Sequence, residues 1–171
     1  MKDTFCEQLI KRKTSSKQTF LKYAAIAFSF GIVVFVFLHS RGSIGLTLAA
    51  AVALGFANYY LAMFTSKEYE YTFTSGELDI DCIYSKSSRR RKLTCDVKEA
   101  FVLAHSQSRE AAGEVANAQM TLDFGSGEIS DKTWYLVISH ESKRTKVILE
   151  PNDEMLAALK AAIRPFKVKT K

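Results

Sequence analysis

The sequence predicts an N-terminal transmembrane helical hairpin followed by a β-rich domain of about seven antiparallel strands and one C-terminal helix. Two long apolar runs predict the hairpin, alternating apolar residues after Ser66 predict strands, and an apolar stripe after Pro151 predicts the helix. A chain of 171 residues has room for one modest domain besides membrane segments. We therefore expect a basic cytoplasmic segment over residues 1–19, a hairpin over 20–64 and a domain over 67–171.

Each apolar run is long enough to cross a bilayer. The run 20–38 contains one charged residue, Lys22, in its first turn, and the run 44–64 contains none. At ~1.5 Å rise per residue, each helix would cross ~30 Å of hydrocarbon. Because only residues 39–43 connect the runs, we expect antiparallel neighbouring helices.

Small residues recur at every fourth position of the second run, and two more in the first run form a matching notch. They predict close packing of the helices at Gly45, Ala49, Ala53 and Ala57 against Ala27 and Gly31. The alternative is a helix that is simply rich in alanine, and the same stripe could join two copies of the chain. Asn58, beside Tyr59 near the helix end, is interpreted as an interfacial residue.

The positions of basic residues predict the orientation of the hairpin. Before or at the start of the first run stand Lys2, Lys11, Arg12, Lys13, Lys17 and Lys22, whereas the connection carries only Arg41. Basic residues favour the cytoplasmic side, so we expect a multi-pass protein of the cell membrane with both termini in the cytoplasm. A cleaved signal peptide is disfavoured because the run is long and a second run follows at once.

Alternating residues then predict a meander of strands. The first two strands, over 69–74 and 77–84, are joined by a Ser75–Gly76 turn. A third strand over 93–97 is expected to place Leu93, Cys95 and Val97 opposite Tyr84, Cys82 and Ile80. This register would bring Cys82 and Cys95 together as reduced thiols, since the cytoplasm disfavours disulfides.

The rest of the chain predicts four more strands and a helix. The strands are expected over 100–104, 119–124, 133–140 and 145–149. A helix begins at Pro151–Asp153, with one apolar stripe made of Met155, Leu159, Ala162, Ile163 and Phe166.

Seven strands followed by one helix is the element order of the pleckstrin-homology (PH) superfold. The strings YEYTFTSGELDID at 69–81 and LTCDVKE at 93–99 resemble an uncharacterised, unknown-function family of small two-span Gram-positive bacterial membrane proteins with a bacterial PH-like domain. The resemblance implies a PH-like fold but no activity. The only tryptophan, Trp134, stands in a strand rather than in the closing helix, which differs from better-known PH domains and argues against phosphoinositide binding.

The sequence contains no arrangement typical of an enzyme. His39, His105 and His140 stand in separate contexts, and the cysteines lack metal-binding spacing, so we predict no catalytic residues, metal or cofactor. Asp79 and Asp81 could form a carboxylate pair, but alternation on the solvent face of a strand explains them better.

A basic segment between the second and third predicted strands is the strongest candidate site. It contains Lys86, Arg89, Arg90, Arg91 and Lys92, in a loop expected to return toward the bilayer and meet an anionic phospholipid. The alternative is a solvated turn that prevents edge aggregation. Nucleic acid is not expected as a partner, because no aromatic residues interleave the charges.

These observations predict a non-enzymatic, membrane-anchored interaction or scaffold module. Its partners would be the lipid bilayer, an anionic phospholipid, and an unidentified protein or a second copy of the chain. The alternative is an enzyme, or a regulatory subunit of an enzyme, that acts on a membrane-localised substrate through Asp79, Asp81 and His140.

Overall fold

The computed structural model describes residues 5–13, 16–40, 43–65, 67–84 and 88–170. These residues form two compact units. One comprises Met1–Lys13 together with Lys67–Lys171, and the other comprises Thr14–Ser66. We call them the β-rich unit and the helical unit.

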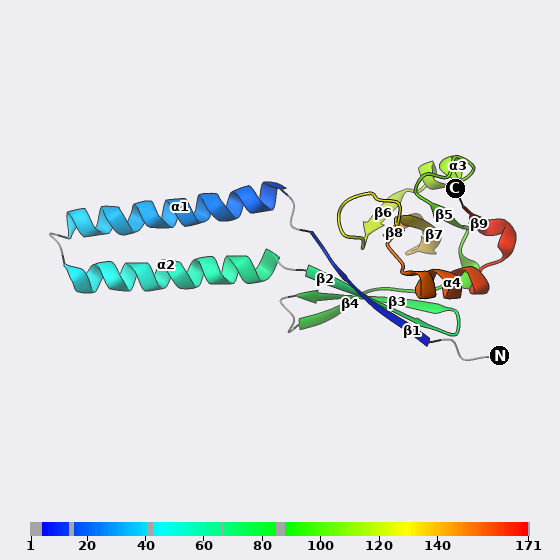
Figure 1. The fold of residues 1–171 in the computed structure, drawn as a ribbon, viewed down its shortest axis with the longest axis horizontal. Helices are drawn as coiled ribbons and strands as arrows, with labels where there is room; N and C mark the ends of the chain where they lie inside the picture. The colour runs from blue at the N-terminus through cyan, green and yellow to red at the C-terminus, as the bar shows by residue number, and fades with distance from the viewer. Residues whose placement is uncertain (1–4, 14–15, 41–42, 66, 85–87, 171) are drawn as a thin grey trace. The chain divides into compact units, whose positions relative to one another are not determined.

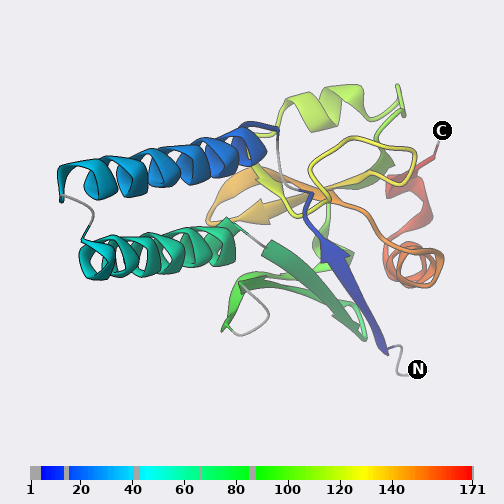
Figure 2. The same cartoon turned by 60° about the vertical axis from the view of Figure 1, so that its left-hand side comes forward.

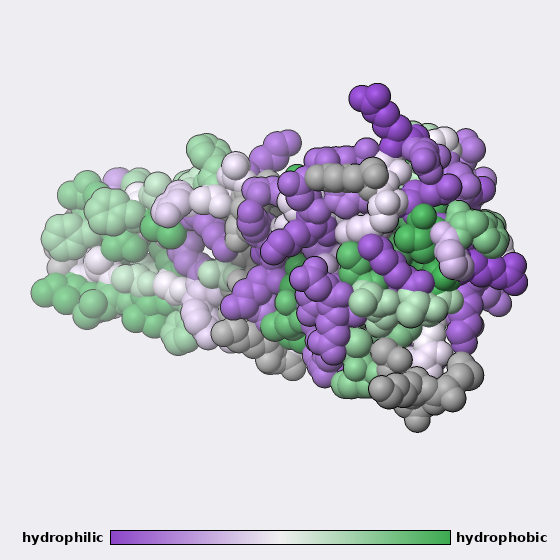
Figure 3. Space-filling model, turned by 45° about the vertical axis from the view of Figure 1, so that its right-hand side comes forward, coloured by the Kyte–Doolittle hydropathy of each residue, from purple (hydrophilic) through white to green (hydrophobic). Residues whose placement is uncertain are grey.

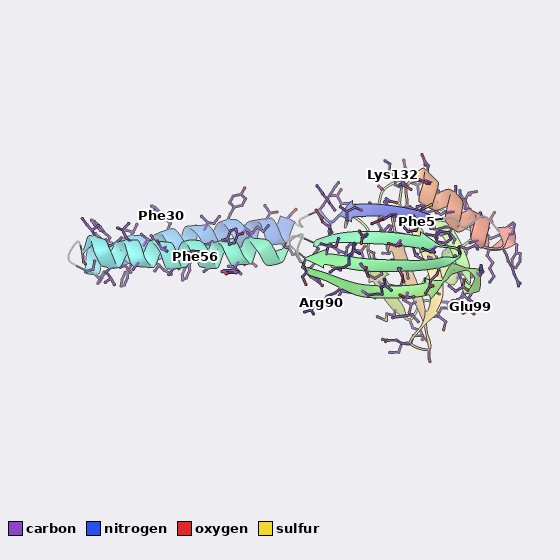
Figure 4. All side chains as sticks on the ribbon, turned by 90° about the horizontal axis from the view of Figure 1, so that it is seen from below. Phe5, Phe30, Phe56, Arg90, Glu99 and Lys132 are labelled. Carbon is purple, nitrogen blue, oxygen red and sulfur yellow. The ribbon has the colours of Figure 1, made fainter. Side chains whose placement is uncertain are left out.

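The helical unit consists of two antiparallel helices, α1 (Ser16–His39) and α2 (Ile44–Thr65) (Figures 1 and 2). Both predicted helices are thus confirmed, and α1 begins four residues earlier than predicted. The segments Thr19–His39 and Ile44–Ala62 are long and apolar enough to cross a membrane, and neither is buried. Figure 3 shows apolar side chains over the helices, and Phe30 and Phe56, labelled in Figure 4, are exposed.

The predicted packing of the two helices is wrong. Among the α2 side chains that the structure describes, Thr47, Ala50, Ala51, Leu54 and Asn58 are half-buried, whereas Gly45, Ala49, Ala53 and Ala57 are exposed. Ala27 and Gly31 of α1 are exposed as well. A Cβ added at Gly31 or Gly45 would meet no atom within 4 Å. The predicted face was wrong because an alanine-rich helix presents small residues on several faces. Spacing alone therefore does not identify the face of α2 that packs against α1.

The β-rich unit contains a four-stranded antiparallel sheet, sheet A, in the order β1-β2-β3-β4. Its strands are β1 (Phe5–Lys11), β2 (Lys67–Thr74), β3 (Glu77–Tyr84) and β4 (Ser88–Asp96). Ser75 and Gly76 join β2 to β3 with positive φ values of 52° and 110°, as tight hairpin turns require. Tyr71, Phe73 and Ile80 point into the core.

Strand β1 was not predicted, because residues 1–19 were interpreted as a basic segment outside the domain. It pairs with β2 from Phe5↔Thr74 to Lys11↔Glu68 and buries Cys6 in the domain core. The helical unit is therefore inserted between the first two strands of the sheet, as the colour order of Figure 1 shows.

A second sheet, sheet B, has the order β6-β8-β7-β5-β9. Its strands are β5 (Val102–His105), β6 (Met120–Asp123), β7 (Trp134–His140), β8 (Lys143–Leu149) and β9 (Val168–Lys169). The β5·β9 and β6·β8 pairs are parallel, which the prediction of antiparallel strands missed. Short helices lie at Val97–Glu99 (η1), Ala112–Ala116 (α3) and Pro165–Lys167 (η2).

Helix α4 (Asp153–Ala162) completes the domain, as predicted. Asn152 caps it by accepting a hydrogen bond from the Met155 backbone N–H at 2.8 Å. Met155 and Leu159 are fully buried in one core with residues of both sheets, including Tyr71 and Leu136. Phe166 departs from the prediction: it lies in η2, beyond the helix, and is 68% exposed.

The predicted register of the third strand is also wrong. Leu93 lies opposite Ile80 and Cys95 lies opposite Leu78, because β4 begins at Ser88 and a bulge beside Ile80/Asp81 leaves Lys92 without a cross-strand partner. Cys82 therefore faces Arg90 rather than Cys95. Cys6, Cys82 and Cys95 are all free.

Candidate functional site

The candidate site is one end of sheet A, which we call the basic end and define by Lys67, Tyr84, Arg90 and Lys92. Lys67 is the first residue of β2 and lies opposite Tyr84, the last residue of β3. Arg90 lies opposite Cys82 in the first half of β4. Figure 4 shows Arg90 near this end and Glu99 near the other end of the sheet.

The ring of Tyr84 lies near two lysine side chains at the basic end. Its ring centroid lies 5.7 Å from Lys67 Nζ and 5.8 Å from Lys92 Nζ. Both distances are within the range of cation–π attraction. Lys92 is the extra residue of the bulge, which explains how a side chain from β4 reaches the end of β3.

Arg90 is exposed, and among the described residues it has no ion-pair partner. Directly opposed residues share a face of a sheet, so Arg90 lies on the same face as Cys82 and the core, beyond the rim of the buried residues. Arg90, Lys67 and Lys92 are thus three cations without neutralising carboxylates among the residues that the structure describes.

Arg89 and Arg91 have a different environment, on the outer face of sheet A. Arg89 forms ion pairs with Glu70 and, at 3.8 Å, with Asp81. Arg91 lies 3.2 Å from carboxylate oxygens of both Asp79 and Asp81. Three carboxylates therefore surround these two arginines, so their charge is largely balanced within the sheet.

The carboxylate of Glu70 is nearly inaccessible, since the residue is 7% exposed. Burial raises the pKa of Glu70, a hydrogen bond with the Glu7 side chain raises it further, and Arg89 opposes the shift. The outer face is a network of ion pairs and hydrogen bonds, which includes a bond from Thr94 Oγ1 to Asp79. This network explains the positions of these carboxylates on the outer face.

The structure does not assemble the residues of the predicted enzyme alternative. Asp79 and Asp81 are engaged by Arg91, while His140 lies in β7 of the other sheet, opposite Lys143. Over the described ranges, no group of three His, Cys, Asp or Glu residues is arranged to hold a metal ion.

A second cluster fixes the end of β1, where the chain leaves the sheet. The Arg12 backbone N–H donates to the Lys67 carbonyl at 3.0 Å. The Arg12 guanidinium donates to the Tyr69 hydroxyl and to the backbone carbonyl and carboxylate of Asp123, at 3.1, 3.0 and 2.8 Å. Arg12 therefore connects β1 to both sheets.

The lipid-binding role predicted for the basic segment stays a prediction, and the positions of its residues differ from the expected loop. Arg89, Arg90, Arg91 and Lys92 lie in strand β4 rather than in a loop, and Lys86 lies outside the described residues. Sequence reasoning missed Lys67 and Tyr84. They could have been identified as site residues because one begins a strand and the other ends the strand paired with it, and such residues lie at the same end of the sheet.

Two sheets around one core, closed by a C-terminal helix, define a PH-like domain, which here carries two apolar helices between its first and second strands. The family model described as bacterial PH-like domain (DUF6106) matches residues 2–170, and the chain belongs to this uncharacterised family. Comparison with curated proteins and with solved structures found no significant match. The matched range includes the helical unit.

Proposed function

We propose that this protein is a non-enzymatic, membrane-anchored interaction module. The helical hairpin crosses the cell membrane, the PH-like domain is held at the inner surface, and the basic end contacts anionic phospholipid. From that position the domain would present its other surfaces to an unidentified protein partner or to a second copy of the chain.

The observation that carries this proposal is the insertion of the helices between β1 and β2. The Lys13 backbone N–H donates a hydrogen bond to the Ser126 carbonyl in the domain, and only residues 14 and 15 separate Lys13 from α1. At the other end of the helical unit, only residue 66 separates α2 from Lys67. An extended residue spans about 3.5 Å, so this covalent connection keeps Lys67, one residue of the basic end, within about 7 Å of the last residue of α2.

The same insertion supports a hairpin with both ends on one side of the membrane. Strand β1 pairs with β2 along its whole length, so the segments that flank the helices share one compartment. Two membrane crossings satisfy this requirement, whereas one crossing does not. The excess of basic residues around the start of α1 favours the cytoplasmic side.

The strength of the lipid contact follows from the three basic residues that have no carboxylate partner among the described residues. A basic residue near an anionic surface contributes about 1 kcal/mol, so Lys67, Arg90 and Lys92 together would contribute about 3 kcal/mol. Arg89 and Arg91 contribute less because carboxylates already balance them. This energy is enough to orient a domain that the helices already anchor.

Lipid proximity can be tested on the full chain in nanodiscs. A fluorophore placed by Ser88→Cys, at the exposed start of β4, would report energy transfer from headgroup-labelled lipid. We expect stronger transfer in phosphatidylglycerol than in phosphatidylcholine, and a decrease as salt screens the surface. The triple variant Lys67→Gln, Arg90→Gln, Lys92→Gln should lose the difference.

The matched control removes the same charge elsewhere in the domain, through Lys98→Gln, Lys132→Gln and Lys143→Gln, which are exposed positions. This control should keep the preference for the anionic lipid. Equal transfer in the two lipids, or equal loss in both triple variants, would contradict a contact at the basic end.

A further inference from the structure

A cavity of about 140 Å³ lies between α1 and α2. Its lining is mostly apolar and comprises Leu21, Lys22, Ala25, Ile26, Asn58, Leu61 and Ala62. Because the helices are antiparallel, the first turns of α1 and the last turns of α2 form its walls. At ~1.5 Å rise per residue, Lys22 and Asn58 lie about 10 Å from the helix ends that connect to the strands.

Lys22 places a positive charge in this apolar cavity. It is the only charged residue of the apolar segment Thr19–His39, and it is half-buried. No carboxylate pairs with it in the part of the chain that the structure describes. A cation on an apolar wall is costly unless an anion or water reaches it, so the cavity favours a ligand that is both anionic and apolar.

Asn58 adds a hydrogen-bond acceptor to the cavity. Its Nδ2 donates to Ser29 Oγ at 2.8 Å and to the Leu54 carbonyl at 2.9 Å, which uses both N–H groups. Ser29 Oγ in turn donates to the Ala25 carbonyl at 2.8 Å. These bonds hold the amide between the helices. No described residue donates to the side-chain carbonyl oxygen, which can accept a hydrogen bond from a hydroxyl group.

We propose that this cavity binds one anionic phospholipid whose headgroup carries a hydroxyl. The phosphate pairs with Lys22, the hydroxyl donates to Asn58 Oδ1, and an acyl chain lies along Leu21, Ile26 and Leu61. The proposal rests on the membrane location of the hairpin, but it concerns a different site from the basic end. Charge complementarity at Lys22 selects this ligand over a neutral lipid.

Native mass spectrometry of the full chain in detergent, titrated with phosphatidylglycerol or phosphatidylcholine, tests the site. We expect phosphatidylglycerol to bind with higher affinity, and Lys22→Gln to weaken it about five- to tenfold. The matched control Lys17→Gln removes the same charge from an exposed position of α1 and should change affinity less than twofold. Ala25→Leu, which reduces the cavity while keeping Lys22, should also weaken binding, with circular dichroism as the check on helix content.

Several results would overturn the proposal. They are equal binding of the two lipids, equal loss in Lys22→Gln and Lys17→Gln, or a dimer of the chain that excludes lipid. The triple variant of the basic end should still bind phosphatidylglycerol in the cavity. This result distinguishes failure of the cavity site from failure of the lipid contact proposed for the domain. Release of the full chain from membranes by alkaline carbonate would instead contradict the membrane location on which both rest.

Discussion

Arg12 Nη2 lies 2.8 Å from Asp123 Oδ2, which joins the end of β1 to the end of β6 in the other sheet. Gln8 makes a second connection, donating to the Glu150 carbonyl at 2.9 Å and accepting from the Asn152 N–H at 2.7 Å. Strand β1 is therefore an integral part of the PH-like domain, although the helical unit separates it from β2 in the sequence.

The first prediction concerns the dependence of the domain on β1. Because Lys11 lies opposite Glu68, a short turn in place of residues 14–66 should join β1 directly to β2 and yield a soluble, folded chain. A fragment of residues 67–171 lacks β1, exposes core otherwise covered by Cys6 and Ile10, and loses the Gln8 hydrogen bonds. We expect its free energy of unfolding to be lower by more than about 3 kcal/mol. Urea unfolding of the two chains measures the difference, and equal stability would show that β1 is dispensable.

The second prediction concerns Arg12. In the chain with the short turn, Arg12→Gln should lower the free energy of unfolding by about 1–2 kcal/mol, since it removes charge-assisted hydrogen bonds to a partly exposed carboxylate. Lys11→Gln is the matched control, because Lys11 is exposed and adjacent, and it should cost less than about 0.5 kcal/mol. A similar cost for both variants would mean that the Arg12 contacts do not stabilise the domain.

The third prediction is a pH dependence due to Glu70. Since burial raises the pKa of Glu70, the folded domain binds its proton more tightly than the unfolded chain, so this group destabilises the domain increasingly as pH rises through the folded pKa. Glu70→Gln should therefore raise the free energy of unfolding above that of the native chain at pH 7. This advantage should shrink as pH falls toward 4. Unfolding curves from pH 4 to pH 8 test this. If the advantage of Glu70→Gln instead grew as pH fell, the ion pair with Arg89 would outweigh burial.

The fourth prediction concerns the cysteine thiols. Burial raises the pKa of Cys95 to about 12, and burial also raises the pKa of Cys6, so both remain protonated at pH 8. We expect slow alkylation of these thiols by iodoacetamide in the native chain and rapid alkylation after denaturation, as measured by mass spectrometry. Rapid native modification of Cys95 would contradict its environment in β4.

Local patterns were sufficient to predict much of the fold. Continuous apolar runs identified α1 and α2, alternation identified β2, β3, β7 and β8, and the capped amphipathic segment identified α4. Strand β1 was missed because its pattern is ambiguous: Gln8 points inward while Phe5 and Leu9 are exposed. Its pairing with β2 also crosses the whole helical unit, and no local pattern encodes such a long-range contact.

The candidate site was harder to predict than the fold. The basic residues were evident in the sequence, but the bulge at Lys92 shifts the register and decides which arginines face the carboxylates of β2 and β3. Tertiary geometry thus decides that Arg89 and Arg91 are paired, whereas Arg90 has no ion-pair partner among the described residues. The same holds for Asn58, whose bond to Ser29 depends on how α2 is rotated against α1.

Membrane extraction tests the central claim most directly, by comparing the full chain with the chain in which a short turn replaces residues 14–66. After washing bacterial membranes with alkaline carbonate, we expect the full chain in the pellet and the chain with the short turn in the soluble fraction, folded, with cross-strand contacts between Gln8 and Tyr71. Release of the full chain into the supernatant would contradict a helical hairpin that crosses the membrane.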